Sequence, residues 1–295
     1  MKTFIVTGAT RGLGLEIARA LAVIPDTDVV LAVRDATKGA EVARALGKNV
    51  RVLPLDLSDL TDVRRFASAW TSPLAGLVNN AGVQETTGTG RTKDGLELTI
   101  GTNHIGAFAL TEALLPSLMG GRVMFIGSGT HNPAKATEFG FRGGRFTSIE
   151  ALARGDTDAA DEGQANRDRY ATSKLLNTMT AMEWARRIRT TTFLTLDPGL
   201  MPGTGLARKH SLPMRIIWSS LLHLVAPLIL KDSSTATRSG RAAAWLMTDP
   251  SVVSGEVYSF DRKPSQQVWE KARDPQLMAA VIDQTSAFLR GHGFA

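Results

Sequence analysis

The sequence predicts an α/β protein built on one doubly wound parallel sheet with helices on both faces. Short apolar segments of strand length alternate with segments of helical periodicity. Most of the strand segments are apolar throughout, as strands buried on both faces should be. A glycine-rich turn joins the first strand segment to the first helical one. Together these three observations are typical of the Rossmann fold.

Seven segments are expected to form strands, because they are rich in Val, Ile, Leu and Phe without polar alternation. They are Thr3–Thr7, Val29–Val33, Val50–Leu55, Gly76–Asn79, Arg122–Gly127, Thr192–Leu196 and Gly255–Phe260. Helices are expected between them, where apolar residues recur at helical spacing. Among these helices are Leu13–Val23, Asp59–Trp70, Leu96–Leu118 and Ala171–Arg189.

Two segments interrupt this alternation. Asn132–Arg169 is polar and glycine-rich, whereas Leu200–Ser233 is apolar. Long insertions in compact domains are usually lids, binding loops or disordered excursions. No linker rich in Pro, Gly or Ser divides the chain, so we expect a single domain over residues 1–295 with a substrate lid at 200–233. A buried core helix, a dimer contact and a membrane-surface contact are the alternatives for the apolar segment.

Composition narrows the function. The net charge is +6, but the basic residues are scattered, so no nucleic-acid partner is expected. The chain has no cysteine, which excludes disulfides and thiolate chemistry, and no His/Asp/Glu cluster has metal-ligand spacing. The chain starts directly with a strand segment, without the pattern of a secretory signal, and we expect a cytoplasmic protein.

The turn after the first strand predicts a dinucleotide site. Its sequence, from Thr7 to Gly14, is TGATRGLG. Glycines let the backbone approach a pyrophosphate closely, and the following helix offers N–H groups and a partial positive charge. A plain glycine-rich turn between a strand and a helix is the alternative interpretation.

The residue after the second strand indicates which dinucleotide binds. An acid about twenty positions beyond the glycines would bind a ribose 2′-hydroxyl. Arg34 stands there instead, followed by Asp35, and its planar fork suits a 2′-phosphate. Arg11 and Lys38 are expected to contribute to the same pocket. The sequence therefore predicts NADP(H), with a surface cation beside Asp35 as the alternative for Arg34.

A Tyr/Lys pair is the candidate acid–base group. Tyr170 and Lys174 are four residues apart, so on a helix they share a face. A neighbouring ammonium lowers a phenol's pKa toward the working pH, where proton transfer is efficient. This pair therefore predicts proton transfer by Tyr170, with Lys174 as its activator.

Other polar residues follow the central strands, at the carboxyl edge where ligands bind in such folds. Ser128 follows the fifth strand, outside the Gly-x-Ser-x-Gly setting of a serine hydrolase. Asn80, Ala81 and Gly82 follow the fourth strand, and Asp56-Leu57 follows the third, within reach of an adenine. Asn103 lies in a helical segment weakened by glycines, where a local break is expected to hold water near Lys174.

Taken together, these motifs resemble the short-chain dehydrogenase/reductase family. TGATRGLG is similar to its cofactor turn, Asn-Asn-Ala-Gly at 79–82 to its structural motif and Asp197-Pro198-Gly199 to its proline–glycine motif beside the nicotinamide. The glycine spacing resembles the compact branch of the family. YATSKLLNTM, PGLMPGTGLAR and DPSVVSGEVYSF resemble retinol-dehydrogenase-like and light-dependent protochlorophyllide reductase-like members.

The resemblance implies two sets of site residues. Asn103, Ser128, Tyr170 and Lys174 would form the catalytic tetrad. Cofactor contacts are expected at Gly8, Thr10, Arg11, Gly12, Leu13, Gly14, Arg34, Lys38, Asp56, Leu57, Asn80, Ala81, Gly82, Tyr170, Lys174, Pro198, Gly199 and Thr204.

The predicted function is NADP(H)-dependent hydride transfer between the nicotinamide and a carbonyl or alcohol of a lipophilic small molecule. The chlorophyll enzymes carry cysteines near their pigment pocket and this chain has none, which favours a carbonyl substrate. Reduction of a ring or conjugated double bond and a catalytically idle NADP-binding module are the alternatives. A homo-oligomer and a peripheral membrane contact stay open as partners.

Overall fold

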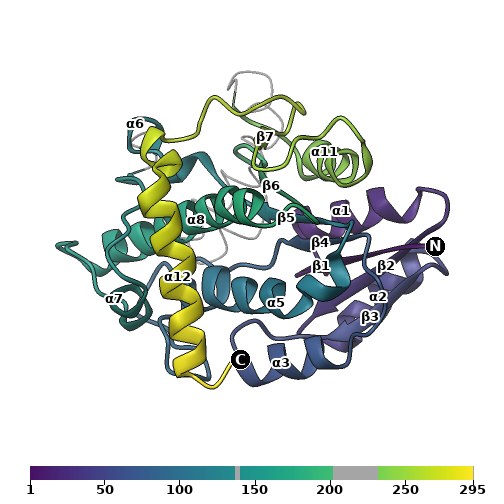
Figure 1. Ribbon diagram of the computed structural model, residues 1–295, viewed down its shortest axis with the longest axis horizontal. Coiled ribbons are helices and arrows are strands. Elements are labelled where there is room, and N and C mark those ends of the chain that lie inside the picture. Colours follow the sequence, from purple (N-terminus) through teal and green to yellow (C-terminus); the bar gives the residue numbers. More distant parts are fainter. Residues whose placement is uncertain (137–139, 202–231, 295) are drawn as a thin grey trace, which may run out of the picture.

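The protein is described from a computed structural model, which places residues 1–136, 140–201 and 232–294. Seven parallel strands form one sheet in the order β3-β2-β1-β4-β5-β6-β7 (Figure 1). The strands are β1 (Lys2–Thr7), β2 (Thr27–Val33), β3 (Val50–Pro54), β4 (Gly76–Asn79), β5 (Arg122–Ile126), β6 (Thr192–Asp197) and β7 (Val257–Ser259). The doubly wound sheet and all seven predicted strands are confirmed.

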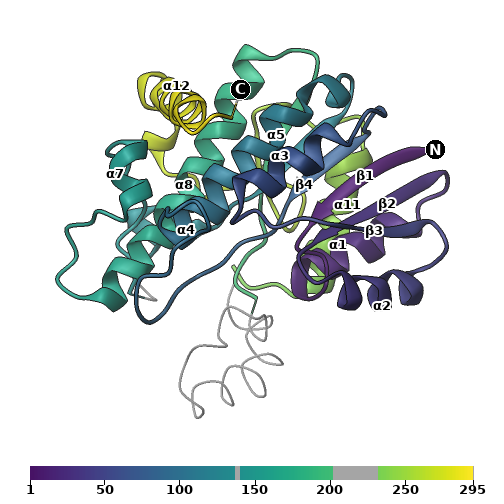
Figure 2. The same cartoon turned by 90° about the horizontal axis from the view of Figure 1, so that it is seen from below.

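Helices cover both faces of the sheet (Figure 2). On one face lie α1 (Gly12–Ala22), α2 (Ala36–Leu46) and α11 (Ala236–Thr248), and on the other α3 (Leu60–Ser68), α5 (Ala107–Leu114) and α8 (Glu162–Arg187). Alternate strand residues enter two separate cores, because successive side chains point to opposite faces. In β1, for example, Phe4 packs with the α1 side and Ile5 with the α3 side.

The strand order reverses between β1 and β4. From β1 the chain steps to β2 and β3 on one side, and β4, β5 and β6 then extend the sheet on the other. The helices that follow β1 and β4, α1 and α5, therefore lie on opposite faces of the sheet, and a crevice opens at the carboxyl ends of the strands. Such a reversal is where doubly wound folds bind ligands.

The expected helix over Leu96–Leu118 is broken into four pieces. A short helix α4 (Leu98–Ile100) leads into a π-helical turn over Gly101–Gly106, then into α5, and a 3₁₀ turn follows at Leu115–Leu118. At Gly106 an added Cβ would lie 2.1 Å from the carbonyl oxygen of Leu57, so only glycine permits this approach. The local break expected around Asn103 is thus present.

The boundary expected for the long helix near Tyr170 is wrong. Helix α8 begins at Glu162, inside the charged segment that the sequence assigned to an insertion, and Asp161 caps it by accepting from the Gln164 N–H at 2.8 Å. The same insertion also contains α6 (Pro133–Ala136) and α7 (Ile149–Arg154). The available signal for its start was the N-cap pattern of Asp161 and Gln164, because polar and apolar residues do not alternate regularly along a helix that is buried almost all round.

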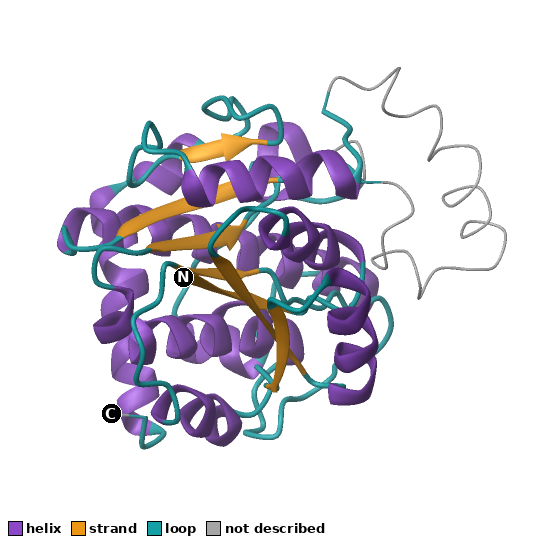
Figure 3. Cartoon of the chain, turned by 90° about the vertical axis from the view of Figure 1, so that its right-hand side faces the viewer, coloured by secondary structure: helices purple, strands orange, loops and turns teal. Residues whose placement is uncertain are grey.

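The C-terminal helix α12 (Pro275–Gly291) packs against α8 (Figure 1). Figure 3 shows the same layers from the side, with helices on either side of the strands. None of the helices in the described part of the chain is long and apolar enough to cross a membrane. Residues 202–231, which carry most of the expected lid and Thr204, lie outside the described residues.

Candidate active site

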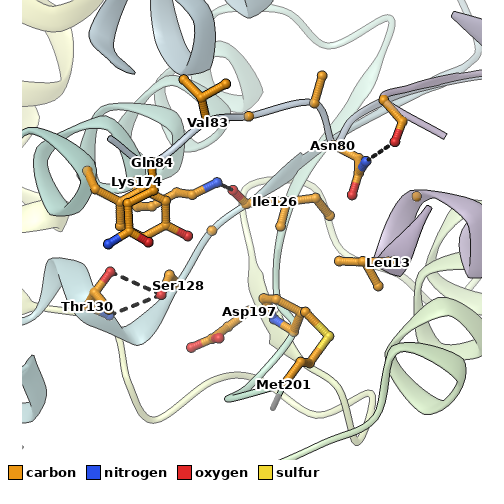
Figure 4. Close-up of a pocket in the computed structure, with 18 of the residues that line it drawn as sticks. Leu13, Asn80, Val83, Gln84, Ile126, Ser128, Thr130, Lys174, Asp197 and Met201 are labelled. Carbon is orange, nitrogen blue, oxygen red and sulfur yellow. Dashed lines mark hydrogen bonds between the residues drawn. The ribbon is translucent and has the colours of Figure 1, made fainter. Parts of the chain in front are cut away.

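A cleft of about 1660 Å³ lies along the carboxyl ends of the strands. Pockets for a single small ligand usually measure roughly 300–1,000 Å³, so this cleft has room for a dinucleotide and a second molecule. All the cofactor-contact residues expected from the sequence line it, Thr204 excepted because it is not described. Ser128 also lines the cleft, whereas Asn103 does not (Figure 4 shows part of the lining).

At one end of the cleft the glycine turn is packed tightly against the loop after β4. Gly8 has φ +66°, and a Cβ there would lie 2.9 Å from the Cα of Ala81. A Cβ on Gly14 would lie 2.4 Å from Nδ2 of Asn80. Glycine is therefore required at both positions for backbone conformation, packing or both.

Hydrogen bonds hold this arrangement. The Thr7 hydroxyl accepts from the N–H groups of Asn80 (3.0 Å) and Ala81 (2.9 Å), and Asn80 Nδ2 donates to the Thr7 carbonyl at 2.8 Å. In Figure 4 the Asn80 side chain turns toward the glycine turn. Asn80 therefore braces the cofactor turn, and Thr7 is a site residue that the sequence interpretation missed.

The N-terminus of α1 is suited to an anion. Within the described structure Arg11, at its N-cap, contributes no side-chain cap, and the first turn carries no acidic residue. The first N–H groups of a helix lack intrahelical partners and sit at the positive end of its dipole. Gly12, Leu13 and Gly14 line the cleft, so these donors are available to a pyrophosphate.

The loops after β2 and β3 line the same end. Asp35 caps α2 by accepting from the Lys38 N–H at 3.0 Å, and the Lys38 ammonium pairs with it at 3.0 Å, so that carboxylate is already engaged. Arg34 is exposed and lines the cleft. Asp56 accepts from the N–H and the hydroxyl of Ser58 at 2.9 and 2.7 Å, which fixes its carboxylate at the cleft wall.

At the other end of the cleft the structure brings Ser128, Tyr170 and Lys174 together. Tyr170 and Lys174 share one face of α8, with the Lys174 nitrogen 5.5 Å from the Tyr170 ring centre. The Lys174 ammonium donates to the Ile126 carbonyl at 2.9 Å, and the Ser128 hydroxyl accepts from the Thr130 hydroxyl at 3.0 Å (Figure 4). The Tyr/Lys spacing and the strand-end serine thus mark one site.

The electrostatics differ from the sequence-based expectation for Tyr170. Burial, with a further contribution from the charge of Asp197, raises the pKa of the phenol instead of lowering it. Burial also lowers the pKa of Lys174 to about 8, so its ammonium is not a strong fixed charge beside the phenol. In this state Tyr170 keeps its proton, as a proton donor to a substrate oxygen must.

Asp197 is the second residue that the sequence interpretation missed. It ends β6, is 7% exposed and lines the cleft, where burial raises the pKa of its carboxyl to about 6. Its Oδ1 accepts from the Gly199 N–H at 3.1 Å. An acidic residue ending an apolar strand at the edge that carries Ser128 was the available signal, and it was interpreted only as part of a proline–glycine motif.

Asn103 lies behind the cleft wall. Its Oδ1 accepts from the Val83 N–H at 2.7 Å, and its Nδ2 donates to the Val83 carbonyl at 2.9 Å and to the Ser173 hydroxyl at 3.1 Å. Its main-chain carbonyl accepts from Asn177 at 3.0 Å. Asn103 therefore ties the loop after β4 to α8, and the relay water expected there stays a prediction.

The two histidines near these residues have structural partners. His104 is fully buried between Asn177 (3.3 Å) and Thr285 (3.1 Å), and burial lowers its pKa to about 4. His131 bonds the Ser128 carbonyl through Nδ1 and accepts from the Trp269 N–H through Nε2 at 3.2 Å. Neither ring lines the cleft, so both histidines have structural roles.

Comparisons with known proteins match this fold and site. The family model for short chain dehydrogenases matches residues 2–137. The chloroplastic protochlorophyllide reductase of Pisum sativum is 34% identical, over 91% of this chain and 74% of that protein. The protochlorophyllide reductase of Avena sativa is 32% identical, over 92% of this chain and 94% of that protein.

Solved structures agree. An uncharacterised protein from Mycobacterium paratuberculosis superposes with a TM-score of 0.74 at 29% identity, covering 98% of this chain and 94% of that one. The 3-ketoacyl-(acyl-carrier-protein) reductase of Brucella melitensis, complexed with NADH, shares the fold with a TM-score of 0.62 at 18% identity, over 88% and 96% of the two chains. A short chain dehydrogenase of Shigella flexneri, complexed with NADP, does so with a TM-score of 0.60 at 20% identity, over 88% and 97%.

The chain belongs to the short-chain dehydrogenase/reductase family, and the resemblance seen in its motifs is confirmed. It is therefore an oxidoreductase of a family whose members use a nicotinamide cofactor.

The raised pKa of Asp197 has a consequence for stability. A carboxyl whose pKa is higher in the folded than in the unfolded state contributes its full stability below the unfolded value, 3.8, and loses it as pH rises through the folded value, about 6. Asp197→Asn is therefore expected to stabilise the cofactor-free protein at pH 8 by about 1–3 kcal/mol. At pH 5 the gain should be about half as large.

Urea unfolding of both proteins at pH 8 and pH 5 measures this difference. Lys174, Tyr170 and Asp232 all interact with the charge of Asp197. Lys174 reduces the stability gained in Asp197→Asn, because its ammonium loses the attraction of the carboxylate. A variant that is less stable than the parent at pH 8 would show that the carboxylate is not buried at a cost.

Proposed function

We propose that this oxidoreductase uses NADP(H) to reduce a carbonyl group, or to oxidise the corresponding alcohol, on a lipophilic small molecule. One observation carries the proposal. A single cleft has an anion-binding helix N-terminus at one end and the hydroxyl groups of Ser128 and Tyr170 at the other. This is the layout required by a dinucleotide whose nicotinamide would face a substrate carbon while the two hydroxyl groups bind the substrate oxygen.

The residues present fit a dinucleotide. A Cβ at Gly8 or Gly14 would collide with the loop after β4. The turn is therefore formed by backbone alone at these positions, which leaves room for a pyrophosphate. The α1 N-terminus supplies donors for the pyrophosphate, and Arg34 supports a 2′-phosphate at the adenosine end. The neighbours were solved with NADH or with NADP, so Arg34 is what favours NADP(H) here.

When bound, a nicotinamide cofactor supplies or accepts the hydride. The protein provides the proton and holds the oxygen. Tyr170 gives its proton to the carbonyl oxygen as the carbon is reduced, and Ser128 donates a hydrogen bond to the same oxygen. One proton is then taken up from solvent to restore the phenol. Burial raises the pKa of Tyr170, so in the cofactor-free site the phenol holds the proton that reduction of a carbonyl consumes.

Apolar residues in the cleft lining support a lipophilic substrate. Val83, Phe141, Leu200 and Met201 line the cleft, and the Phe141 ring centre lies 6.1 Å from that of Tyr170. Apolar walls with a few convergent polar groups are typical of sites that bind lipophilic small molecules. The paired hydroxyls of Ser128 and Tyr170 suit an oxygen atom, and therefore a carbonyl group.

A substrate panel tests this proposal. NADPH oxidation should be faster with lipophilic aldehydes and ketones than with sugars, by at least about tenfold in kcat/KM, because sugar hydroxyls placed against Val83, Phe141, Leu200 and Met201 would lose their hydrogen bonds to water. The decrease in NADPH absorbance measures the rates. Conjugated enones and quinones belong in the panel, and exclusive turnover of their double bonds would replace carbonyl reduction by double-bond reduction.

Arg34 is expected to set the cofactor preference. NADPH should bind at least tenfold more tightly than NADH, a difference of about 1.4 kcal/mol or more. Arg34→Asp should reverse the preference, because a carboxylate repels the 2′-phosphate and accepts from a ribose hydroxyl. Fluorescence titration with both cofactors measures it. Arg44→Asp, on α2 outside the cleft lining, is the matched charge reversal and should keep the preference. Equal affinities in the parent protein would contradict the assignment.

Tyr170 is expected to be the proton donor. Tyr170→Phe should keep the fold and NADPH binding but lower kcat about 10²–10⁴-fold with the best substrate of the panel. The matched control is Tyr258→Phe, because Tyr258 is the only other tyrosine and its hydroxyl accepts from the Val253 N–H at 2.9 Å, away from Ser128. A folded Tyr170→Phe protein that turned over at nearly the parent rate would remove Tyr170 from the mechanism.

A further inference from the structure

Asp197 is a buried acid in the cleft that the mechanism above does not use. It lies at the end of β6, and Figure 4 shows its carboxylate on the side of the cleft where Ser128 lies. Its charge acts on both Lys174 and Tyr170. Burying a carboxylate is costly, and a neutral isostere of the same shape exists in asparagine. Because asparagine would avoid this cost, we expect the charge of Asp197 to have a function.

The fold places this acid beside the reactive end of a bound dinucleotide, an argument that rests on the proposed function. The glycine turn after β1 takes the pyrophosphate, and Arg34 and Asp56, after β2 and β3, line the adenosine end. The other half of the dinucleotide must then extend over β4, β5 and β6. Ser128 follows β5 and Asp197 ends β6, so a bound nicotinamide ring would be held near these strand ends.

The two forms of that ring differ in charge, since the oxidised ring is a cation and the reduced ring is neutral. A carboxylate in a poorly solvated site discriminates strongly between them. Burial raises the pKa of Asp197 to about 6, while the N–H groups of Gly199 and Gly129 favour its ionised form, so it is charged at pH 8. The ammonium of Lys174 would offset the negative charge of Asp197, but burial lowers the pKa of Lys174 to about 8, so this amine is only partly protonated at pH 8.

We propose that the Asp197 carboxylate stabilises the oxidised nicotinamide ring over the reduced ring, and so makes the bound reduced cofactor a stronger hydride donor. This agrees with a site whose phenol is held protonated, because a carbonyl that takes up the hydride must also take up a proton. The alternative is a purely local role, in which the carboxylate only accepts from Gly199 and shapes the turn after β6. Asparagine keeps an oxygen that can accept from Gly199, and it removes the charge together with the acceptor for the Gly129 N–H, so Asp197→Asn tests the charge while the bond to Gly199 is retained.

The experiment is a titration of the full-length parent and the Asp197→Asn variant with NADP⁺ and with NADPH at pH 8, followed by protein fluorescence. We expect the variant to bind NADP⁺ at least about fivefold more weakly relative to NADPH than the parent does. Asp56→Asn is the matched control, because it removes one charge from the adenosine end of the same cleft. That variant should leave the ratio of the two dissociation constants unchanged.

Each outcome decides the proposal. A ratio unchanged in Asp197→Asn overturns it and leaves the proposed function standing, and so does an equal change in both variants. Failure of the parent protein to bind any nicotinamide nucleotide overturns the proposed function and this inference with it. If the parent prefers NAD⁺ and NADH, the same comparison is made with that pair. Should Asp197→Asn fail to fold, Asp197→Ser, which keeps a hydroxyl acceptor near Gly199, is titrated in its place.

Discussion

The site depends on the close contact between the glycine turn and the loop after β4. Gly8 and Gly14 bring the turn so near Asn80 and Ala81 that a Cβ at either glycine would overlap a neighbour. Thr7 and Asn80 then hold the two loops together by hydrogen bonds. Because β1 and β4 are the strands at which the order reverses, this contact sets the floor of the crevice. The adenosine end and the catalytic end are positioned on either side of it.

At the end of the cleft that holds Tyr170, Lys174 and Asp197 the dominant factor is burial. Tyr170, Lys174 and Asp197 are each less than a tenth exposed, and burial shifts the pKa of each toward its neutral form. Such perturbed groups are typical of functional sites, where stability is given up for chemistry. The phenol stays protonated, which suits a donor, and the acid and the amine remain close to the point at which each changes charge.

Hydrogen bonds behind the cleft wall connect the elements that carry these groups. Asn103, in the π-helical turn, binds the loop at Val83 with its side chain and is itself held by Asn177 of α8. His104 in the same turn reaches Thr285 of α12. The helix irregularity thus joins the cleft wall, α8 and the C-terminal helix, which agrees with the frequent occurrence of π-helical turns at functional sites. The rigidity of α8 in turn fixes the distance between Tyr170 and Lys174.

The sequence by itself determined the sheet, the cofactor turn and the grouping of Ser128, Tyr170 and Lys174, because these depend on local periodicity, glycine spacing and the common edge of parallel strands. Only the tertiary structure decided that the polar residues before Tyr170 belong to a buried helix, because Asn166, Asp168 and Arg169 find their hydrogen-bond partners far along the chain. The tertiary structure also decided the protonation states of the site residues. The pKa values of Tyr170 and Asp197 follow from desolvation by residues far apart in the chain, which no local pattern records.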